Sequence, residues 1–110
     1  MQTKANDPTD VDGTISVISN MVAVCFYTPG GYVELREVAD DKKNLCDTYE
    51  DWLVEFSKAV NGLRNEGMDV VPITIDIAKL VQWCRQNKLK NISSNRSKYV
   101  AELCKTQFGN

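Results

Sequence analysis

Residues 47–67, DTYEDWLVEFSKAVNGLRNEG, carry the clearest helical pattern in the chain. The large apolar side chains fall at steps that place them on one stripe of an α-helix: Tyr49, Trp52, Leu53, Phe56, Val60 and Leu63. Asp47 with Glu50 three positions later fits a capping box, and Gly67 can adopt the left-handed conformation that ends helices. We therefore expect a central amphipathic helix at 47–66, with the core packed against its apolar stripe.

Length and composition predict one domain. The chain has 110 residues, of which 43% are hydrophobic, and this is enough to build a core without disulfides or a metal. Residues 1–12 are polar and lack periodicity, so we expect a flexible tail there and a single globular domain at 13–110. The longest apolar run, at 21–27, is too short to span a membrane, and 1–12 lack the apolar segment of a secretory signal. We expect a cytoplasmic protein.

The segment before the central helix predicts strands. Residues 21–28 (MVAVCFYT) form a continuous apolar run of strand length. A turn signal, Pro-Gly-Gly at 29–31, follows, and residues 32–38 (YVELREV) alternate between apolar and polar. The simplest interpretation is an antiparallel hairpin across 29–31, with 14–18 as a candidate third strand. A helix at 15–21 is the alternative.

The segment after the central helix predicts an extended stretch and then two helices. Residues 68–75 (MDVVPITI) contain Pro72, which disfavours a helix and suits an edge strand or a buried connector. Asp76 is a good N-cap for a helix at 77–87. A third helix is expected at 95–106, capped by Ser93 or Ser94. The expected fold class is α+β: a small two- or three-stranded antiparallel N-terminal sheet followed by three helices around the one at 47–66.

The residue types exclude several kinds of active site. The chain has no histidine, which removes Ser-His-Asp and Cys-His nucleophile pairs and histidine-based metal sites. Its four cysteines, Cys25, Cys46, Cys84 and Cys104, contain no closely spaced pair and fit reduced core thiols. No phosphate-binding glycine motif is present, and the carboxylates are accounted for by helix caps and surface charge. We expect no enzyme, no cofactor and no metal.

Charge is distributed unevenly along the chain, although the net charge is only −2. Residues 1–75 hold six Lys or Arg against thirteen Asp or Glu, whereas residues 76–110 hold seven against two. A charged run at 40–43, Asp-Asp-Lys-Lys, is typical of a solvated loop. The basic C-terminal part is a pattern seen in nucleic-acid-binding proteins, and it is also what a solvated surface balancing an acidic half would show.

The region 76–106 has the outline of a helix-turn-helix, with two short helices and polar residues at the start of the second. Asn and Arg side chains suit contacts with bases, and Lys side chains suit contacts with phosphates. The connection is longer than usual for this motif and lacks the frequent glycine. The candidate nucleic-acid-binding residues are Arg85, Lys88, Lys90, Asn95, Arg96 and Lys98.

Trp83 lies at the margin of the apolar face of helix 77–87, so it either completes the core or anchors an interface. The function we expect from the sequence is non-catalytic binding of a protein partner or of a second copy, with a sheet edge as the surface for pairing. The alternative is a nucleic-acid-binding accessory protein that uses the basic region 76–106.

Overall fold

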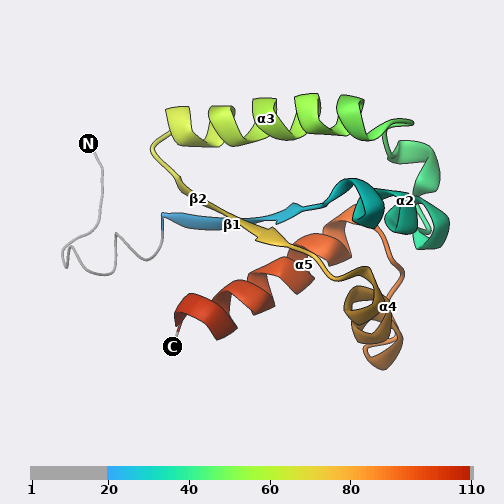
Figure 1. Cartoon of the computed structure of the whole chain (residues 1–110). Coiled ribbons are helices and arrows are strands. Elements are labelled where there is room, and N and C mark those ends of the chain that lie inside the picture. The colour runs from blue at the N-terminus through green and yellow to red at the C-terminus, as the bar shows by residue number, and fades with distance from the viewer. Residues whose placement is uncertain (1–19, 110) are drawn as a thin grey trace.

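The computed structural model describes residues 20–109 and arranges them in two strands and four α-helices (Figure 1). In chain order the elements are β1 (Met21–Phe26), α2 (Pro29–Val38), the short 3₁₀ helix η1 (Lys42–Asn44), α3 (Tyr49–Asn65), β2 (Asp69–Thr74), α4 (Ile77–Gln86), α5 (Ser93–Cys104) and the π-helical turn η2 (Lys105–Gly109). The predicted α+β class is confirmed. The expected tail at 1–12 and the candidate strand at 14–18 lie outside the described residues.

The two strands form a parallel sheet in which Met21 is paired with Asp69 and Phe26 with Thr74. Long α3 lies over one face of this sheet and α5 over the other, as Figure 1 shows. Because the strands are parallel, the chain must cross from the end of β1 to the start of β2, and α2 and α3 make that crossover. Only two strands therefore separate the helical layers within residues 20–109.

The predicted hairpin across 29–31 is wrong. Residues 29–38 form helix α2, and β1 pairs with β2 rather than with the segment that follows it. Thr28 caps the helix by accepting a hydrogen bond from the backbone N–H of Gly31 at 3.0 Å, and Pro29 occupies the first turn, where a missing N–H has no cost. Tyr32 and Leu35 then fall three residues apart on the buried side of the helix.

The predicted central helix is confirmed as α3, and the extended stretch before residue 76 is confirmed as β2. The N-cap of α3 is Thr48 rather than Asp47, because the Thr48 hydroxyl accepts from the N–H of Asp51 at 3.1 Å. Gly67 has a φ of +86° and ends the helix as predicted. Asp76 caps α4 by accepting from the N–H of Lys79 at 3.2 Å.

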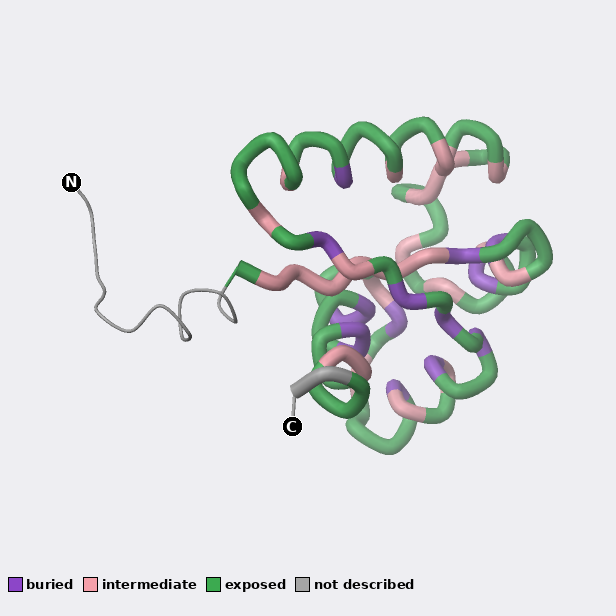
Figure 2. Tube along the Cα trace, turned by 60° about the vertical axis from the view of Figure 1, so that its left-hand side comes forward, coloured by how far each residue is buried: buried purple, intermediate pink, exposed green. Residues whose placement is uncertain are grey.

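The core lies around the sheet end that meets α2, α4 and α5. Its most completely buried side chains are Tyr32, Leu35, Leu80 and Val100. An aromatic cluster joins β1 to α3, with the ring of Trp52 within 5.7 Å, between centroids, of those of Phe26, Tyr27, Tyr32, Tyr49 and Phe56. The outer surface of α3 is exposed along its length in Figure 2, and within α3 only Val60 is fully buried. The apolar stripe of this helix is therefore only partly covered.

All four cysteines are free thiols, and Cys84 is the buried one. Within residues 20–109, every helix is too short or too polar to cross a lipid bilayer.

Candidate functional site

The six residues predicted to bind nucleic acid divide into two groups. Arg85, Lys88, Lys90 and Lys98 are exposed. The first three follow one another along the end of α4 and the turn to α5, where Lys88 has a left-handed φ of 56°. These four side chains are free to meet a partner, and their assignment to nucleic acid stays a prediction.

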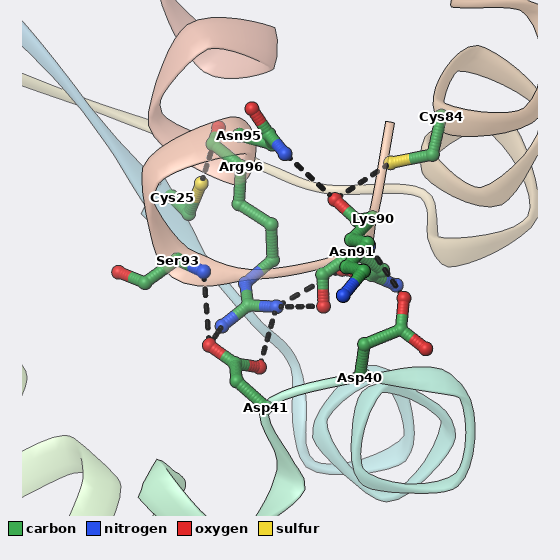
Figure 3. A network of polar contacts seen from close by, with 9 residues as sticks. All are labelled: Cys25, Asp40, Asp41, Cys84, Lys90, Asn91, Ser93, Asn95 and Arg96. Carbon is green, nitrogen blue, oxygen red and sulfur yellow. Dashed lines mark hydrogen bonds and ion pairs between the residues drawn. The ribbon is translucent and has the colours of Figure 1, made fainter. Parts of the chain in front are cut away.

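Asn95 and Arg96 are held inside the protein, with 8% and 5% of their surface exposed. The side-chain amide of Asn95 donates to the Lys90 carbonyl oxygen at 2.9 Å. Arg96 reaches inward to Asp41 and to Asn91, which stand at the centre of the network in Figure 3. Their side chains are therefore engaged in internal contacts rather than presented to a base edge.

Asp41 is the partner of Arg96 in a two-pronged ion pair. Nη1 and Nη2 of Arg96 donate to Oδ1 and Oδ2 of Asp41 at 3.0 and 2.9 Å. The side chains of Arg96 and Asp41 are only 6% and 10% exposed. The interpretation of 40–43 as a simple solvated loop is thus wrong for Asp41, because that sequence pattern carries no information about a partner 55 residues away.

Asp41 also caps helix α5 from outside its own segment. The N–H of Ser93, at the first position of α5, donates to Oδ2 of Asp41 at 2.9 Å. The prediction that Ser93 or Ser94 would be the N-cap is wrong: the helix begins at Ser93, and Ile92 is the capping position without a side-chain bond. A carboxylate at the positive end of a helix is favourable, so one side chain stabilises both the Arg96 guanidinium and the helix start.

Neighbouring Asp40 fixes the connection between α4 and α5. Its Oδ2 accepts from the N–H of Asn91 at 2.7 Å, and its own N–H donates to the Asn91 carbonyl oxygen at 2.9 Å. Figure 3 shows both aspartates reaching from the loop after α2 toward the segment that leads into α5. This polar network determines where α5 lies relative to β1.

Trp83 packs between α4 and α5. Its ring lies 5.3 Å from that of Tyr99, and its Nε1 donates to the Glu102 carboxylate at 3.2 Å. The side chain is partly buried, so it completes the helix packing and leaves one edge toward solvent.

The outer edge of β1 is open in the described part of the chain. The N–H of Asp69 donates to the Asn20 carbonyl and the N–H of Ile75 to the Phe26 carbonyl, so even-numbered positions of β1 direct their backbone groups toward β2. The odd-numbered positions, Ala23 and Cys25, therefore direct theirs away from β2. No strand formed by residues 20–109 pairs with that edge.

A hollow of about 250 Å³ lies along this edge at the end of β1. Its walls are Trp52 from α3 on one side and Ser93, Ser97 and Val100 from α5 on the other. The rest of the lining comes from β1 and its neighbours: Ala23, Val24, Cys25, Tyr27, Leu45 and Arg96. We call this hollow the β1 groove. The hydroxyl of Tyr49 donates to the carbonyl oxygen of Tyr27, a lining residue, at 2.7 Å.

The ionisable groups of the β1 groove are held in their neutral or paired forms. Burial raises the pKa of the Cys25 thiol, an effect only partly offset by the Tyr27 hydroxyl and the Arg96 charge. Burial, together with the neighbouring Cys25, also raises the pKa of Tyr27. Since Asp41 neutralises Arg96, the groove presents hydroxyls and apolar surface without net charge. Because the thiolate is the nucleophilic form of cysteine, the raised pKa lowers the reactivity of Cys25.

Within residues 20–109, no group of three or more Cys, Asp or Glu side chains is arranged to hold a metal ion. Comparison of this chain with known protein families, with curated proteins and with solved structures finds no match.

Proposed function

We propose that this chain is a non-catalytic protein-binding module that accepts an extended segment of a partner protein as an added strand on the outer edge of β1. The observation that carries the proposal is the β1 groove, where the outward backbone groups of Ala23 and Cys25 adjoin a hollow between two helices. In strand addition, such main-chain groups supply affinity and the adjoining pocket selects side chains.

The composition of β1 supports the proposal. Its sequence, MVAVCF, is uniformly apolar, which is typical of a strand in the interior of a parallel sheet. Every residue of β1 is nevertheless only partly buried. In a two-stranded sheet, β1 has a neighbouring strand on one side only. A strand added from a partner would pair with its other side.

The two edges of the sheet differ in whether their residues allow a further strand to pair. Pro72 occupies an outward-facing position of β2, where its missing N–H costs no bond to β1 and blocks pairing from outside. β1 carries no such block, since its outward positions are Met21, Ala23 and Cys25. Pairing is thus discouraged at β2 and left available at β1.

The shape of the β1 groove favours a single extended peptide over a second folded copy. An approaching strand must enter between Trp52 of α3 and Ser97 of α5. A second copy would bring its own α3 and α5 to the same place, whereas a peptide has no such bulk. Because the groove has no net charge, we expect the peptide to present apolar and hydroxyl or amide side chains there.

The test uses the full chain, linear peptides selected on it from a random library displayed on phage, and hydrogen exchange. We expect the amides of Ala23 and Cys25 to exchange rapidly in the free protein and to become protected when a selected peptide is bound. Ala23→Pro removes one outward N–H without breaking the hydrogen bonds to β2. The affinity for the selected peptide should therefore fall about tenfold. Ala23→Ser is the matched control, because it keeps the N–H at the same position.

Three outcomes would overturn the proposal. Selected peptides that bind wild type and Ala23→Pro equally would place the binding surface elsewhere. Slow exchange of Ala23 and Cys25 in the dilute free protein would mean that another part of the chain already covers the edge. A dimer in light scattering that dissociates in Ala23→Pro would assign the edge to a second copy.

A second candidate function is contact with nucleic acid. The observation that favours it is the exposed series Arg85, Lys88 and Lys90 on the α4–α5 turn, with Lys98 on the first half of α5. With Arg96 and Asn95 engaged internally, these contacts would be to phosphates rather than to bases.

A further inference from the structure

The segment of the chain that immediately precedes β1 has the sequence pattern of a strand. Residues 14–17 alternate between hydroxyl and apolar side chains (TISV), and Ile18 follows. Only residues 19 and 20 separate this segment from β1, and Asn20 lies in a turn. Two residues are the length of the shortest common connection in a β-hairpin. The segment 14–18 is therefore placed in the sequence where it can reach the open edge of β1.

A two-residue connection determines which backbone groups of the two strands meet. The residues that flank such a turn form a hydrogen-bonded pair, and every second pair beyond them is hydrogen-bonded as well. The bonded pairs would be Ile18 with Met21, Ser16 with Ala23, and Thr14 with Cys25. The odd-numbered positions of β1 are the ones whose backbone groups point away from β2, and no strand formed by residues 20–109 pairs with them. The pairs that the turn would form are therefore the pairs that the edge of β1 leaves available.

The side chains of β1 alternate between the two helical layers. The ring of Phe26 lies 5.6 Å from that of Trp52 and 5.4 Å from that of Phe56, so even-numbered positions face α3. Sγ of Cys25 donates to the carbonyl oxygen of Arg96 at 3.5 Å, so odd-numbered positions face α5. Because directly opposed residues of paired strands share a face, the layer that each side chain of 14–18 would meet follows from its partner on β1.

The two layers match the two kinds of side chain in the segment. Ile15 and Val17 would lie opposite even-numbered positions of β1 and face α3, whose apolar stripe is only partly covered. Ser16 would lie opposite Ala23 and face α5, where Ser93 and Ser97 line the β1 groove. The segment therefore presents apolar side chains to the apolar wall and a hydroxyl to the wall that carries hydroxyls.

We propose that residues 14–18 pair with the outer edge of β1 as an antiparallel strand and compete there with the partner peptide. This inference rests on the proposed function, because it names an internal competitor for the same edge. The resulting sheet is mixed, with parallel β2 on one side of β1 and the antiparallel segment on the other. The connection, Ser19-Asn20, lacks the glycine that two-residue turns favour, so the paired and open forms have similar populations. The amides of Ala23 and Cys25 consequently still exchange rapidly in the free protein.

The pairing is tested first without any peptide, by NMR of the full chain. In an antiparallel sheet the Cα atoms of a non-hydrogen-bonded pair are only about 4.5 Å apart, so their α-protons give a nuclear Overhauser effect. We expect this effect between Val17 and Val22 and between Ile15 and Val24, at a strength that does not change with protein concentration. A saturating peptide, selected on the full chain as described above, should remove both effects because it occupies the same edge.

Two proline variants provide a matched comparison. Ser16→Pro removes an N–H that points toward Ala23, whereas Val17→Pro removes one that points away from β1. Ser16→Pro should abolish the Overhauser effects and roughly double both the exchange rate of Ala23 and the affinity for the selected peptide, because the open form rises from about half of the molecules to nearly all of them. Val17→Pro should leave the exchange rate and the affinity at their wild-type values.

Absence of both Overhauser effects in the wild type would overturn this inference and leave the proposed function intact, because the edge would then be open. Equal changes in Ser16→Pro and Val17→Pro would also overturn it, because the segment would not use these backbone pairs. Effects that grow with protein concentration would assign the added strand to a second copy. Overhauser effects that persist with the selected peptide bound would overturn the competition and the proposed function together, because the peptide would bind elsewhere.

Discussion

The guanidinium of Arg96 and the carboxylate of Asp41 meet inside the protein through two parallel hydrogen bonds of 3.0 and 2.9 Å. This ion pair joins the loop after α2 to the first turn of α5. Because Asp41 also accepts from the N–H of Ser93, it fixes both the position and the start of the helix that walls the β1 groove. The pair therefore holds in place the helix that walls the proposed binding edge, and Arg96 itself lines the groove in a charge-paired form.

Removing the Asp41 charge should destabilise the fold strongly. Asp41→Asn leaves the Arg96 guanidinium buried beside a neutral amide, and losing one partner of a buried pair costs about 3–5 kcal/mol. Asp47→Asn is the matched control, because Asp47 pairs with Arg36 at 3.5 Å while its side chain is 92% exposed. The control should lose less than about 1 kcal/mol. Urea unfolding of both variants measures the loss of unfolding free energy. An equal loss in the two variants would show that the buried pair stabilises the fold no more than the exposed one.

The same pair predicts how stability responds to acid. Burial alone would raise the pKa of Asp41, but the hydrogen bonds from Arg96 and Ser93 and the Arg96 charge outweigh it and hold the pKa below its usual value. A carboxyl with a lowered folded-state pKa contributes its stability above its unfolded-state pKa and loses it as pH falls through the folded-state pKa. Unfolding free energy should therefore fall from about pH 4 downward. Asp41→Asn should show a shallower fall over the same range, and an identical slope in the two proteins would refute the assignment.

The local signals of the chain were sufficient for much of the fold. The stripe of α3, its glycine end and the Asp76 cap each depend on residues within a few positions, and each is present as predicted. Thr28 followed by Pro29 is also a local signal of a helix start, but the alternation at 32–38 points instead to a strand. That alternation counted Val33, which is 59% exposed, as equivalent to Leu35, which is fully buried.

The remaining features depend on contacts between distant segments. Pairing of β1 with β2 joins Met21 to Asp69, and nothing in either strand specifies a parallel partner so far along the chain. The inward orientation of Arg96 is set by Asp41 in the same way. A sequence pattern can indicate that a residue is basic, but only the packing of α5 determines whether it faces solvent. This is why two predicted nucleic-acid contacts lie inside the protein.

Cys25 should react slowly with alkylating agents. Burial raises the pKa of its thiol, so at pH 8 the folded protein holds a smaller fraction of thiolate than the unfolded chain does. We expect iodoacetamide to modify Cys25 more slowly in native buffer than in urea, as followed by mass spectrometry of the peptide that contains it. A peptide bound in the β1 groove should slow the reaction further, whereas equal rates in buffer and urea would contradict the buried, protonated thiol.

Pro72 should protect the protein from self-association. Replacing it with Val restores an outward N–H on β2 and converts a blocked edge into one that can pair. Pro72→Val should therefore increase the apparent mass in light scattering as the concentration rises. Thr74→Val, at an exposed position of the same strand, adds similar apolar surface but keeps Pro72 in place and serves as the control. A Pro72→Val variant that stays monomeric would show that β2 is shielded by something other than the proline.

Nucleic-acid binding, if it occurs on the α4–α5 turn, should depend on charge and not on base sequence. Arg85, Lys88, Lys90 and Lys98 are exposed, whereas Asn95 and Arg96, at the start of α5, are engaged internally. We expect weak binding to a labelled duplex at low salt that falls steeply as salt is added, and loss of that binding in the double variant Lys90→Glu with Lys98→Glu. The control is the double variant Lys42→Glu with Lys43→Glu, which reverses two exposed charges on η1, outside the α4–α5 turn. Equal loss in both variants would indicate a general charge effect, and no binding to single or double strands at low salt would exclude nucleic acid as the partner.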